Sequence, residues 1–306
     1  TCALPILMIA QVSQEHSLPH IPVMVSEVME YLNLQPKGIY LDGTVGAGGH
    51  ATQILNRLSS QGQLIGIDRD AEALQICENL FGASARPISV HQSSYHKFPD
   101  ILNRLGISKV NGILLDLGLS SMQLDSDSRG FAFESEGQLD MRFNGNSGET
   151  AAELISRSSD NELANIIYQF GEERHSRRIA RSIKNFSNLS TVADLKEAVR
   201  RSTPPQQRRK SLARVFQAIR IAVNGELEKL ASFLDIFFDH LAVGGRVVIM
   251  SYHSLEDRMV KHAFRSLKQA GELKVLTKKP ITPSEDEQAE NSRSRSAKLR
   301  AAERIV

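Results

Sequence analysis

The hydrophobic positions in the first third of the chain form short continuous runs that alternate with helical patterns. Continuous apolar runs are typical of strands buried on both faces, and a regular alternation of strands and helices favours a parallel sheet covered on both sides. We therefore expect such a sheet here. Its strands are predicted at 39–43, 64–68, 88–91 and 112–117, with helices near 49–60, 70–81 and 97–105.

The pattern changes after the fourth predicted strand. Residues 123–148 are rich in Ser, Asp, Gly and Phe and are predicted to form a loop. From 150 to 214 the apolar spacing is helical only. Thr150 and Ser159 are each followed three positions later by Glu, the capping-box pattern that marks the start of a helix. This middle segment is therefore predicted to be all-helical.

The alternation of strands and helices resumes near the end of the chain. The predicted elements are a long helix at 215–241, a strand at 246–250, a helix at 254–269, and two runs at 273–277 and 297–306 that could close the sheet. The predicted fold class is α/β, a doubly wound sheet with an inserted all-helical domain. The predicted boundaries are an N-terminal tail at 1–16, a sheet domain at 17–123 and 215–306, and the helical insertion at 124–214.

Composition and charge indicate the compartment in which the protein works and where it is basic. The only cysteines are Cys2 and Cys77, too few for a disulfide framework, which fits a reducing compartment. No apolar run reaches the ~18 residues needed to cross a bilayer, so we expect a cytoplasmic protein with no membrane partner. The net charge is only +2, but Lys and Arg are concentrated between Arg174 and Arg220. That window is strongly basic and the rest of the chain is acidic.

A glycine-rich turn, DGTVGAGGH, occupies residues 42–50 after the first predicted strand. Such a turn cradles a ligand at the carboxyl edge of a parallel sheet, although a tight turn without a ligand has the same composition. The glycine spacing differs from the dinucleotide pattern, and the carboxylate of Asp42 would repel a pyrophosphate. It would favour a cationic ligand such as S-adenosylmethionine. Asp68 and Asp116 end two further predicted strands, and Asp68 suits the two hydroxyls of a ribose.

Several longer motifs carry a family resemblance. The chain resembles the bacterial 16S ribosomal RNA (cytosine-N4)-methyltransferase family, whose substrate is a decoding-region cytosine of the small subunit. The matching segments are HIPVMVSEV at 20–28, YLDGTVGAGGH at 40–50, GIDRD at 66–70, GILLDLGLSSMQLD at 112–125, RGFAF at 129–133, GQLDMRF at 137–143, QFGEERHSRRIA at 169–180, FQAIRIAVNGEL at 216–227 and SYHSLEDRMVK at 251–261.

The resemblance implies a class I, Rossmann-like methyltransferase fold with S-adenosylmethionine as cofactor. It further implies methyl transfer to the N4 amine of a cytidine, with small-subunit ribosomal RNA or the 30S particle as partner. Tyr95 stands where the family more often has the phenylalanine that lies against the adenine. The cofactor contacts that the resemblance implies are Gly48, Gly49, His50, Asp68, Tyr95, Asp116 and Gln123.

The chemistry of the transfer sets the candidate catalytic residues. The cytosine amine is a weak nucleophile, so the protein must mainly position it and accept its hydrogen bonds. Asp116 and the loop that follows, as far as Ser120, are candidates, although Asp116 could serve the substrate, the cofactor or both. A carbon-5 methyltransferase would need a cysteine nucleophile, and Cys77 falls in the middle of a predicted helix. Covalent catalysis is therefore disfavoured.

The segment SYHSLEDR follows the fifth predicted strand of the sheet domain. His253 and Glu256 could ligate a metal ion, but capping of a helix by Ser254 explains the same pattern more simply. We expect no metal site, and we place His253 near the target-base pocket as a catalytic candidate.

The basic window offers a surface for RNA. Its first four arginines recur at three- and four-residue steps and so share one helix face. A basic face that only meets solvent is the ordinary interpretation, but beside a methyl-transfer site phosphate binding is favoured. The RNA-binding candidates are Arg174, Arg177, Arg178, Arg181, Arg208, Arg209 and Lys210. Two alternatives stay open: a DNA or small-molecule aminomethyltransferase, and an RNA-binding assembly factor with a vestigial cofactor site.

Overall fold

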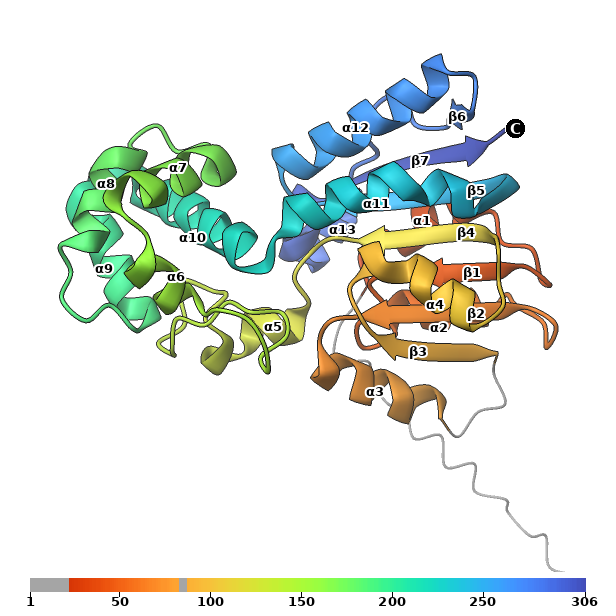
Figure 1. Ribbon diagram of the computed structural model, residues 1–306, viewed down its shortest axis with the longest axis horizontal. Helices are drawn as coiled ribbons and strands as arrows, with labels where there is room; N and C mark the ends of the chain where they lie inside the picture. The colour runs from red at the N-terminus through yellow and green to blue at the C-terminus, as the bar shows by residue number, and fades with distance from the viewer. Residues whose placement is uncertain (1–21, 83–86) are drawn as a thin grey trace, which may run out of the picture.

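The computed structural model describes residues 22–82 and 87–306, so the predicted tail at 1–16 lies outside it. Within these ranges the strands form one sheet in the order β3-β2-β1-β4-β5-β7-β6 (Figure 1). No helix of the described residues is long and apolar enough to span a membrane. The strands are β1 Ile39–Asp42, β2 Gln63–Asp68, β3 Ile88–Gln92, β4 Val110–Asp116, β5 Leu241–Ser251, β6 Leu273–Val275 and β7 Lys298–Arg304.

The first five strands are parallel, as the alternating pattern predicts. Their carboxyl ends therefore meet at one edge of the sheet. Strand β7 runs antiparallel between β5 and β6, so the last two apolar runs do close the sheet. The predicted α/β fold with a doubly wound sheet is confirmed.

Helices cover both faces of the sheet because each strand alternates its buried side chains between them. On one face α1, α2 and α3 pack on residues such as Tyr40 and Leu64. On the other face α4, α11 and α12 pack on residues such as Leu41 and Ile65. These helices are α1 Val25–Leu32, α2 Gly49–Leu55, α3 Ala71–Phe81, α4 Phe98–Arg104, α11 Glu226–His240 and α12 Ser254–Gln269.

A separate group of helices forms the left-hand part of Figure 1 and has its own hydrophobic core. We call it the helical lobe; it comprises α6 Ala151–Arg157, α7 Asp160–Gly171, α8 Ser176–Lys184, α9 Val192–Ser202 and α10 Arg208–Asn224. The capping boxes predicted at Thr150 and Ser159 are present and start α6 and α7. Thr191 forms a third one before α9.

The single long helix predicted at 215–241 is wrong. Gly225 has a φ of +56°, a left-handed conformation that ends α10 and lets α11 start in a new direction. Val215, Phe216 and Ile219 belong to the core of the helical lobe. We therefore propose that the lobe ends near Gly225, beyond the predicted boundary at 214.

The segment between β4 and the helical lobe is mostly loop, as predicted, with two short helical turns. Another short helix and a helical turn lie between β6 and β7, and two more turns precede α4 and α10. These elements are α5 Ser121–Asp125, η2 Asp127–Arg129, α13 Glu285–Glu290, η4 Ser292–Ser296, η1 Tyr95–Lys97 and η3 Pro205–Gln207.

Candidate active site

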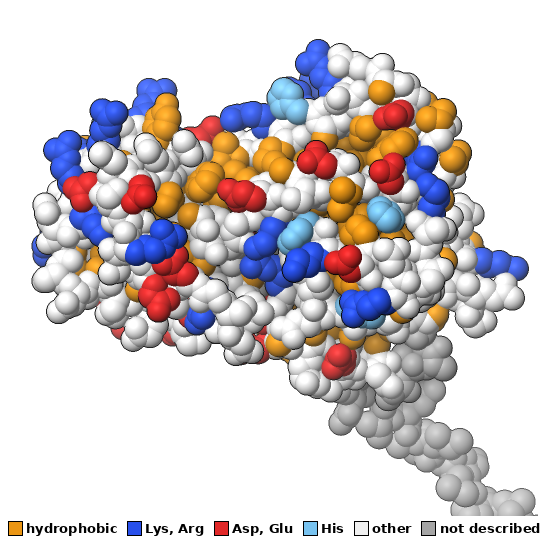
Figure 2. Space-filling view, in the orientation of Figure 1, with side chains coloured by type: hydrophobic (Ala, Val, Ile, Leu, Met, Phe, Trp, Pro, Cys, Tyr) orange, Lys and Arg blue, Asp and Glu red, His pale blue; other side chains and the backbone are white. Residues whose placement is uncertain are grey.

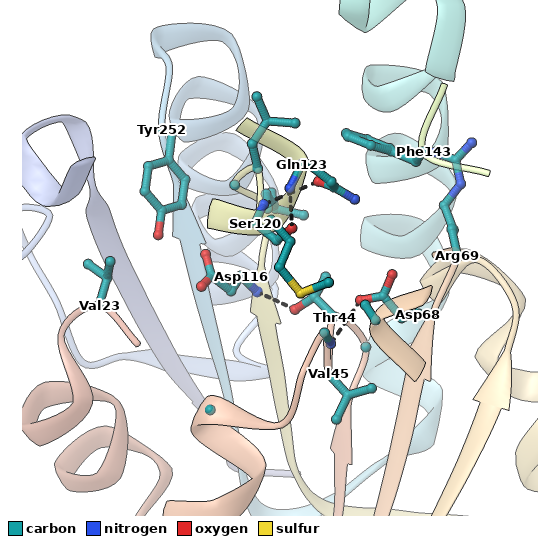
Figure 3. A pocket seen from close by; sticks show the side chains of 18 of the residues that line it. Val23, Thr44, Val45, Asp68, Arg69, Asp116, Ser120, Gln123, Phe143 and Tyr252 are labelled. Atoms are coloured by element: carbon teal, nitrogen blue, oxygen red, sulfur yellow. Dashed lines mark hydrogen bonds between the residues drawn. The ribbon is translucent and has the colours of Figure 1, made fainter. Parts of the chain in front are cut away.

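A pocket of about 310 Å³ lies where β1, β2 and β4 end and the loops toward the helical lobe begin (Figure 3). The three strand ends therefore converge as predicted. The predicted site residues that line the pocket are Gly49, His50, Asp68, Tyr95, Asp116, Ser120 and Gln123. Those that stand outside its lining are Asp42, Gly48 and His253.

The glycine turn ties the ends of the three strands together. Gly46 has a φ of +52°, which side-chain-bearing residues rarely adopt, and its N–H donates to Asp68 Oδ2 at 2.9 Å. Thr44 Oγ1 accepts a hydrogen bond from the backbone N–H of Asp116 at 2.7 Å. The turn thus sets the relative positions of the two acids that face the pocket.

Asp42 lies beneath the turn, with 1 % of its surface exposed. Its Oδ1 accepts a hydrogen bond from the N–H of Thr44 at 3.1 Å. Burial raises the pKa of Asp42 to about 7. The expectation that this carboxylate faces a cationic ligand is therefore corrected, since it braces the turn from below. Gly48 has a similar structural role as the residue that precedes α2.

Asp68 is held in one orientation by two backbone donors. Its Oδ1 accepts from the N–H of Asp70 at 2.9 Å, and its Oδ2 accepts from Gly46. Burial raises the pKa of Asp68. Each carboxylate oxygen still has a lone pair free, so the side chain can accept hydrogen bonds from two neighbouring hydroxyls. This geometry fits the predicted contact with a ribose.

Asp116 and His50 present hydrogen-bond acceptors to the pocket. Nε2 of His50 lies 2.9 Å from the carbonyl oxygen of Val23, so in the neutral ring Nε2 carries the proton and Nδ1 keeps its lone pair. Nδ1 lies 3.9 Å from Asp116 Oδ2. Asp116 Oδ1 is buried and has no hydrogen-bond partner among the described residues. A group with several N–H donors, such as the ammonium of S-adenosylmethionine, would suit His50 Nδ1 and Asp116 Oδ2, and Asp116 Oδ1 would still need a donor.

Tyr252 lies on the other side of Asp116, and its hydroxyl points toward that carboxylate (Figure 3). Burial raises the pKa of Tyr252 well above its ordinary value, and the charge of Asp116 adds to the effect. The phenol therefore stays neutral and can donate to Asp116. Sequence reasoning missed Tyr252, although its place directly after β5 was a usable signal.

Ser120 and Gln123 form a capping box at the start of α5. Ser120 Oγ accepts from the N–H of Gln123 at 3.1 Å, and Gln123 Oε1 accepts from the N–H of Ser120 at 3.2 Å. Gln123 Nε2 donates to Asp70 Oδ2 at 2.9 Å. The amide of Gln123 is thus held in place by bonds within the protein, and its contact with the cofactor stays a prediction.

Tyr95 contributes an aromatic wall from η1. Its ring meets Phe233 edge to face, with the centroids 5.9 Å apart, and its hydroxyl donates to the carbonyl oxygen of Glu226 at 3.5 Å. Stacking on adenine stays a prediction. Arg69 and Lys229, which sequence reasoning missed, also line this part of the pocket. Burial and the charge of Arg69 lower the pKa of Lys229 to about 8.

The SYHSLEDR segment caps α12 in an unexpected way. The N-cap is His253, whose Nδ1 accepts from the N–H of Glu256 at 3.4 Å, so the prediction of Ser254 as the cap is wrong. The hydroxyl of Ser254 donates instead to Glu172 Oε2 in the helical lobe at 2.6 Å. His253 itself stays behind the pocket wall, and Glu256 lines it.

Glu226, His253 and Glu256 place one potential metal-ligand atom each within 4.8 Å of one another. Part of this cluster is already bonded within the protein. The N–H of Glu256 donates to His253 Nδ1, whereas His253 Nε2 lies 3.3 Å from Glu256 Oε1 and has no hydrogen-bond partner among the described residues. Arg220 holds Glu226 with two hydrogen bonds of 2.9 Å each. The expectation of no metal site stays a prediction.

Cys77 is fully buried in the core beneath the sheet and is not a pocket residue. Burial raises the pKa of its thiol to about 12, so little of the reactive thiolate exists near neutral pH. This agrees with the expectation that Cys77 is no catalytic nucleophile.

The predicted RNA-binding side chains lie on the helical lobe, where Figure 2 shows Lys and Arg along the outer edge. We use the name basic surface for the exposed residues Arg174, Arg177, Arg178, Arg181, Arg209 and Lys210. Arg174 precedes α8 instead of belonging to it. Arg208 is half-buried, and its Nε donates to the carbonyl oxygen of Thr203 at 3.4 Å.

Comparison with known proteins places this arrangement in a family. The profile described as the MraW methylase family matches residues 17–305. "Ribosomal RNA small subunit methyltransferase H" of Thermotoga neapolitana is 49% identical over 292 residues, which cover 94% of this chain and 96% of that protein. The protein of the same name from Thermosipho africanus is 47% identical over 290 residues, which cover 94% of this chain and 98% of that protein.

Among solved structures, a putative rRNA-methylase from Clostridium thermocellum is similar with a TM-score of 0.48 and 11% identity, covering 94% of this chain and all of that one. The family profile spans nearly all of the described residues, including the pocket and the helical lobe. The chain therefore belongs to the MraW methylase family, and it is a methyltransferase with S-adenosylmethionine as its methyl donor.

Proposed function

We propose that the protein methylates the exocyclic N4 amine of a cytidine in small-subunit (16S) ribosomal RNA. Its partner would be that RNA or the 30S particle, in the cytoplasm. The relatives' printed name supports a small-subunit ribosomal RNA substrate. The N4 position rests on the resemblance of the sequence motifs and on the acceptor groups of the pocket.

One observation carries the proposal: the buried Oδ1 of Asp116 has no hydrogen-bond partner among the described residues. A buried carboxylate oxygen without a donor is costly, so a ligand with an N–H group is expected to reach it. The other oxygen, Oδ2, lies 3.9 Å from His50 Nδ1, and these two atoms together could accept hydrogen bonds from the cofactor's ammonium. The same carboxylate can thus serve the cofactor and the target amine.

The protein's contribution to the transfer is positioning and hydrogen bonding. S-adenosylmethionine supplies an electrophilic methyl group when it is bound. Asp116 accepts an N–H of the cytosine amine, which turns the nitrogen lone pair away from the ring and toward the methyl carbon. Tyr252, whose hydroxyl points toward Asp116, would donate to it and fix its orientation. After the N–C bond has formed, the nitrogen releases one proton, for which Asp116 is the nearby acceptor.

The remaining candidates have supporting roles in this proposal. Ser120 shapes the loop after β4 by capping α5. His253 caps α12 and so orients Glu256 at the pocket wall. The helical lobe would bind the RNA backbone through the basic surface, because exposed guanidinium groups release counterions when they meet phosphates.

The test is methylation of small ribosomal subunits prepared from a strain that lacks the enzyme. The purified protein and labelled S-adenosylmethionine should modify cytidine, and mass mapping of nucleosides should find N4-methylcytidine. Duplex DNA and free cytidine serve as control substrates. Transfer to duplex DNA only, or N4-methylcytidine absent from a labelled subunit, would refute the proposal.

A further inference from the structure

The segment from Met141 to Phe143 is held in an unusual conformation. Met141 is fully buried and has a φ of +60°, a region that residues with side chains rarely occupy. Such a conformation costs free energy and persists only where the surroundings hold it in place. Two residues, Asn224 and Arg129, hold this segment in its conformation.

Asn224, at the end of α10, holds the segment from one side. Its Oδ1 accepts from the N–H of Phe143 at 2.8 Å, and its Nδ2 donates to the carbonyl oxygen of Met141 at 2.7 Å. Only 2 % of Asn224 is exposed. The last residue of the helical lobe thus binds two backbone groups of the segment.

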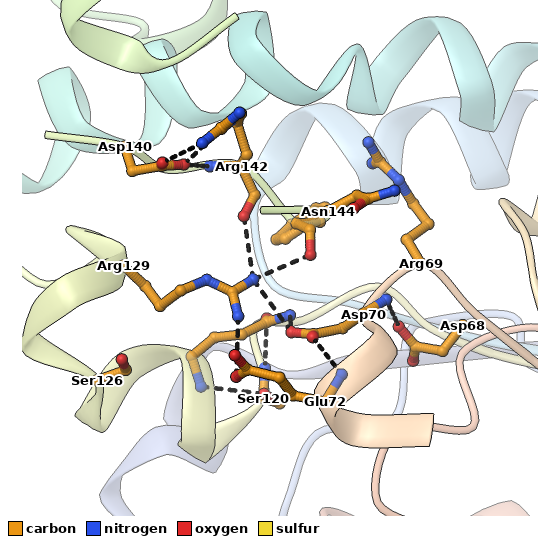
Figure 4. Close-up of polar contacts among 12 residues, drawn as sticks. Asp68, Arg69, Asp70, Glu72, Ser120, Ser126, Arg129, Asp140, Arg142 and Asn144 are labelled. Carbon is orange, nitrogen blue, oxygen red and sulfur yellow. Dashed lines mark hydrogen bonds and ion pairs between the residues drawn. The ribbon is translucent and has the colours of Figure 1, made fainter. Parts of the chain in front are cut away.

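Arg129 holds the segment from the other side (Figure 4). Its carbonyl oxygen accepts from the N–H of Met141 at 2.9 Å. Its Nη2 donates to the carbonyl oxygens of Arg142 at 3.1 Å and Phe143 at 2.9 Å. The guanidinium therefore fixes the part of the segment that Asn224 leaves free.

The same guanidinium binds the sheet domain. Its Nη2 also lies 3.1 Å from Asp70 Oδ2, and its Nη1 lies 3.4 Å from Glu72 Oε2. Asp70 is buried, and its own N–H donates to Asp68, the acid that fits the ribose. Because the Arg129 side chain is only 13 % exposed, solvent screens these contacts less than surface ion pairs. Arg129 thus links the segment to Asp70, which in turn holds the proposed ribose-binding residue Asp68.

The contacts of Asn224 and Arg129 set the position of Phe143 relative to the pocket. It lines the pocket, and the guanidinium carbon of Arg69 lies 5.2 Å from the centre of its ring. Arg69 follows Asp68 in the chain, so Phe143 stands beside the ribose end of the pocket. Its backbone N–H and carbonyl are both bonded, which fixes the position of the backbone from which the ring projects.

We propose that Arg129 is a positioning residue for the cofactor: it fastens the segment Met141–Phe143 to Asp70 so that Phe143 closes the pocket wall beside the ribose site. Lysine could replace the charge, but it is shorter and has one nitrogen, so it could not contact Asp70 and the two carbonyl oxygens, as Nη2 does, and also Glu72, as Nη1 does. The proposal concerns cofactor binding alone and does not depend on which nucleotide is methylated.

The experiment is a double-mutant cycle on the full chain, with S-adenosylhomocysteine as the titrated ligand and calorimetry as the readout. Arg129→Gln and Phe143→Leu should each weaken binding about tenfold. If Arg129 acts through Phe143, the affinity of the double variant should be at most about twofold below that of the single variant with the lower affinity. The second substitution then removes no further contact with the ligand. Multiplied effects of the two changes, near a hundredfold, would overturn the proposal, as would unchanged affinity in Arg129→Gln.

A matched control separates positioning from general stability. Arg246 also joins a carboxylate, Glu303, to a backbone carbonyl, that of Tyr31, but it lies on β5 outside the pocket lining. Arg246→Gln should lower the melting temperature while leaving affinity for S-adenosylhomocysteine within about twofold. If it weakens binding as much as Arg129→Gln does, the effect is general destabilisation and the proposal fails.

Two further variants keep the test decisive. Should Arg129→Gln not fold, the cycle is run with Arg129→Lys, which retains the charge and should still weaken binding. In Arg129→Ala, added methylguanidinium should restore part of the affinity by occupying the vacated space. Full affinity in Arg129→Lys, or no recovery with methylguanidinium in a folded Arg129→Ala, would contradict the proposed role.

Discussion

The pocket and the basic surface both concentrate charge, but the pocket mixes acids with bases such as Arg69 and Lys229, whereas the basic surface carries only exposed cations. The pocket region holds acids that are buried or half-buried and fixed by specific donors, as Asp68 is by two backbone N–H groups. The basic surface carries exposed arginines. A fixed, buried charge has one geometry and one partner, so a single substitution should matter greatly. Exposed charges act through their sum and are screened by salt.

Asp116→Asn should give the largest effect. The variant keeps the size of the side chain but loses its charge and gains a donor, so the transfer step should slow by roughly 10²–10³, the scale for one preorganised electrostatic contact. Single-turnover methylation at saturating cofactor is the measurement. If instead only cofactor affinity falls and the saturated rate survives, Asp116 serves the cofactor alone; a variant normal in both would remove Asp116 from the site.

Asp42→Asn should change how stability depends on pH. Burial raises the pKa of Asp42 to about 7, above its unfolded value, so its contribution to stability is full at acidic pH and is lost as pH rises through about 7. Asparagine does not titrate, and the variant should avoid a loss of about 4 kcal/mol between pH 4 and pH 8. Urea unfolding of the cofactor-free protein at several pH values tests this. Parallel profiles for both proteins would contradict it.

Asp68→Ala should weaken cofactor binding by about 1.5–3 kcal/mol, because two ribose hydroxyls lose a charged acceptor. Calorimetric titration with S-adenosylhomocysteine measures the change, and the melting temperature of the free protein checks the fold. An unaltered affinity in a folded variant would remove Asp68 from the ribose site.

Replacing Arg177, Arg178 and Arg181 together by Ala should have the smallest effect per residue. RNA binding should weaken, and the slope of log affinity against log salt should fall by about two, since three phosphate contacts to single strands are lost. Cofactor affinity should not change.

A triple variant on another exposed basic face provides the control for that prediction. Lys261, Arg265 and Lys268 are exposed on α12, outside the helical lobe. Their replacement by Ala removes the same charge but should leave the salt dependence intact. If both triple variants change the salt dependence of RNA binding equally, the effect comes from total charge and the basic surface is not a specific RNA-binding site.

The sequence predicted helices and strands well where the signal lies within a few neighbouring residues. The apolar runs of β1 to β4 and the capping boxes at Thr150 and Ser159 can be recognised from neighbouring residues alone, and all of them are present. The break at Gly225 was missed because apolar residues keep a helical period on both sides of it. Only the left-handed conformation of the glycine and the separate core of the helical lobe reveal it.

The candidate site was predictable at the strand ends and not beyond them. Asp68 and Asp116 follow strands, so topology alone brings them together. Arg129 and Glu226 reach the region of the site from segments far apart in sequence, and no local spacing predicts such contacts, whereas Tyr252 could have been predicted from its place directly after β5. Asp42 shows a different limit: spacing alone cannot tell whether a side chain faces the pocket, and in the structure only 1 % of Asp42 is exposed.

The burial of Cys77 has a practical consequence for measuring how the two parts of the molecule open. Its sulfur belongs to the core of the sheet domain, not to that of the helical lobe. After a Cys2→Ser substitution it is the sole remaining thiol of the chain. A thiol reagent would then react only when the sheet domain opens, and opening of the helical lobe alone would give no signal. The rate of labelling therefore reports the local stability of the cofactor-binding half by itself.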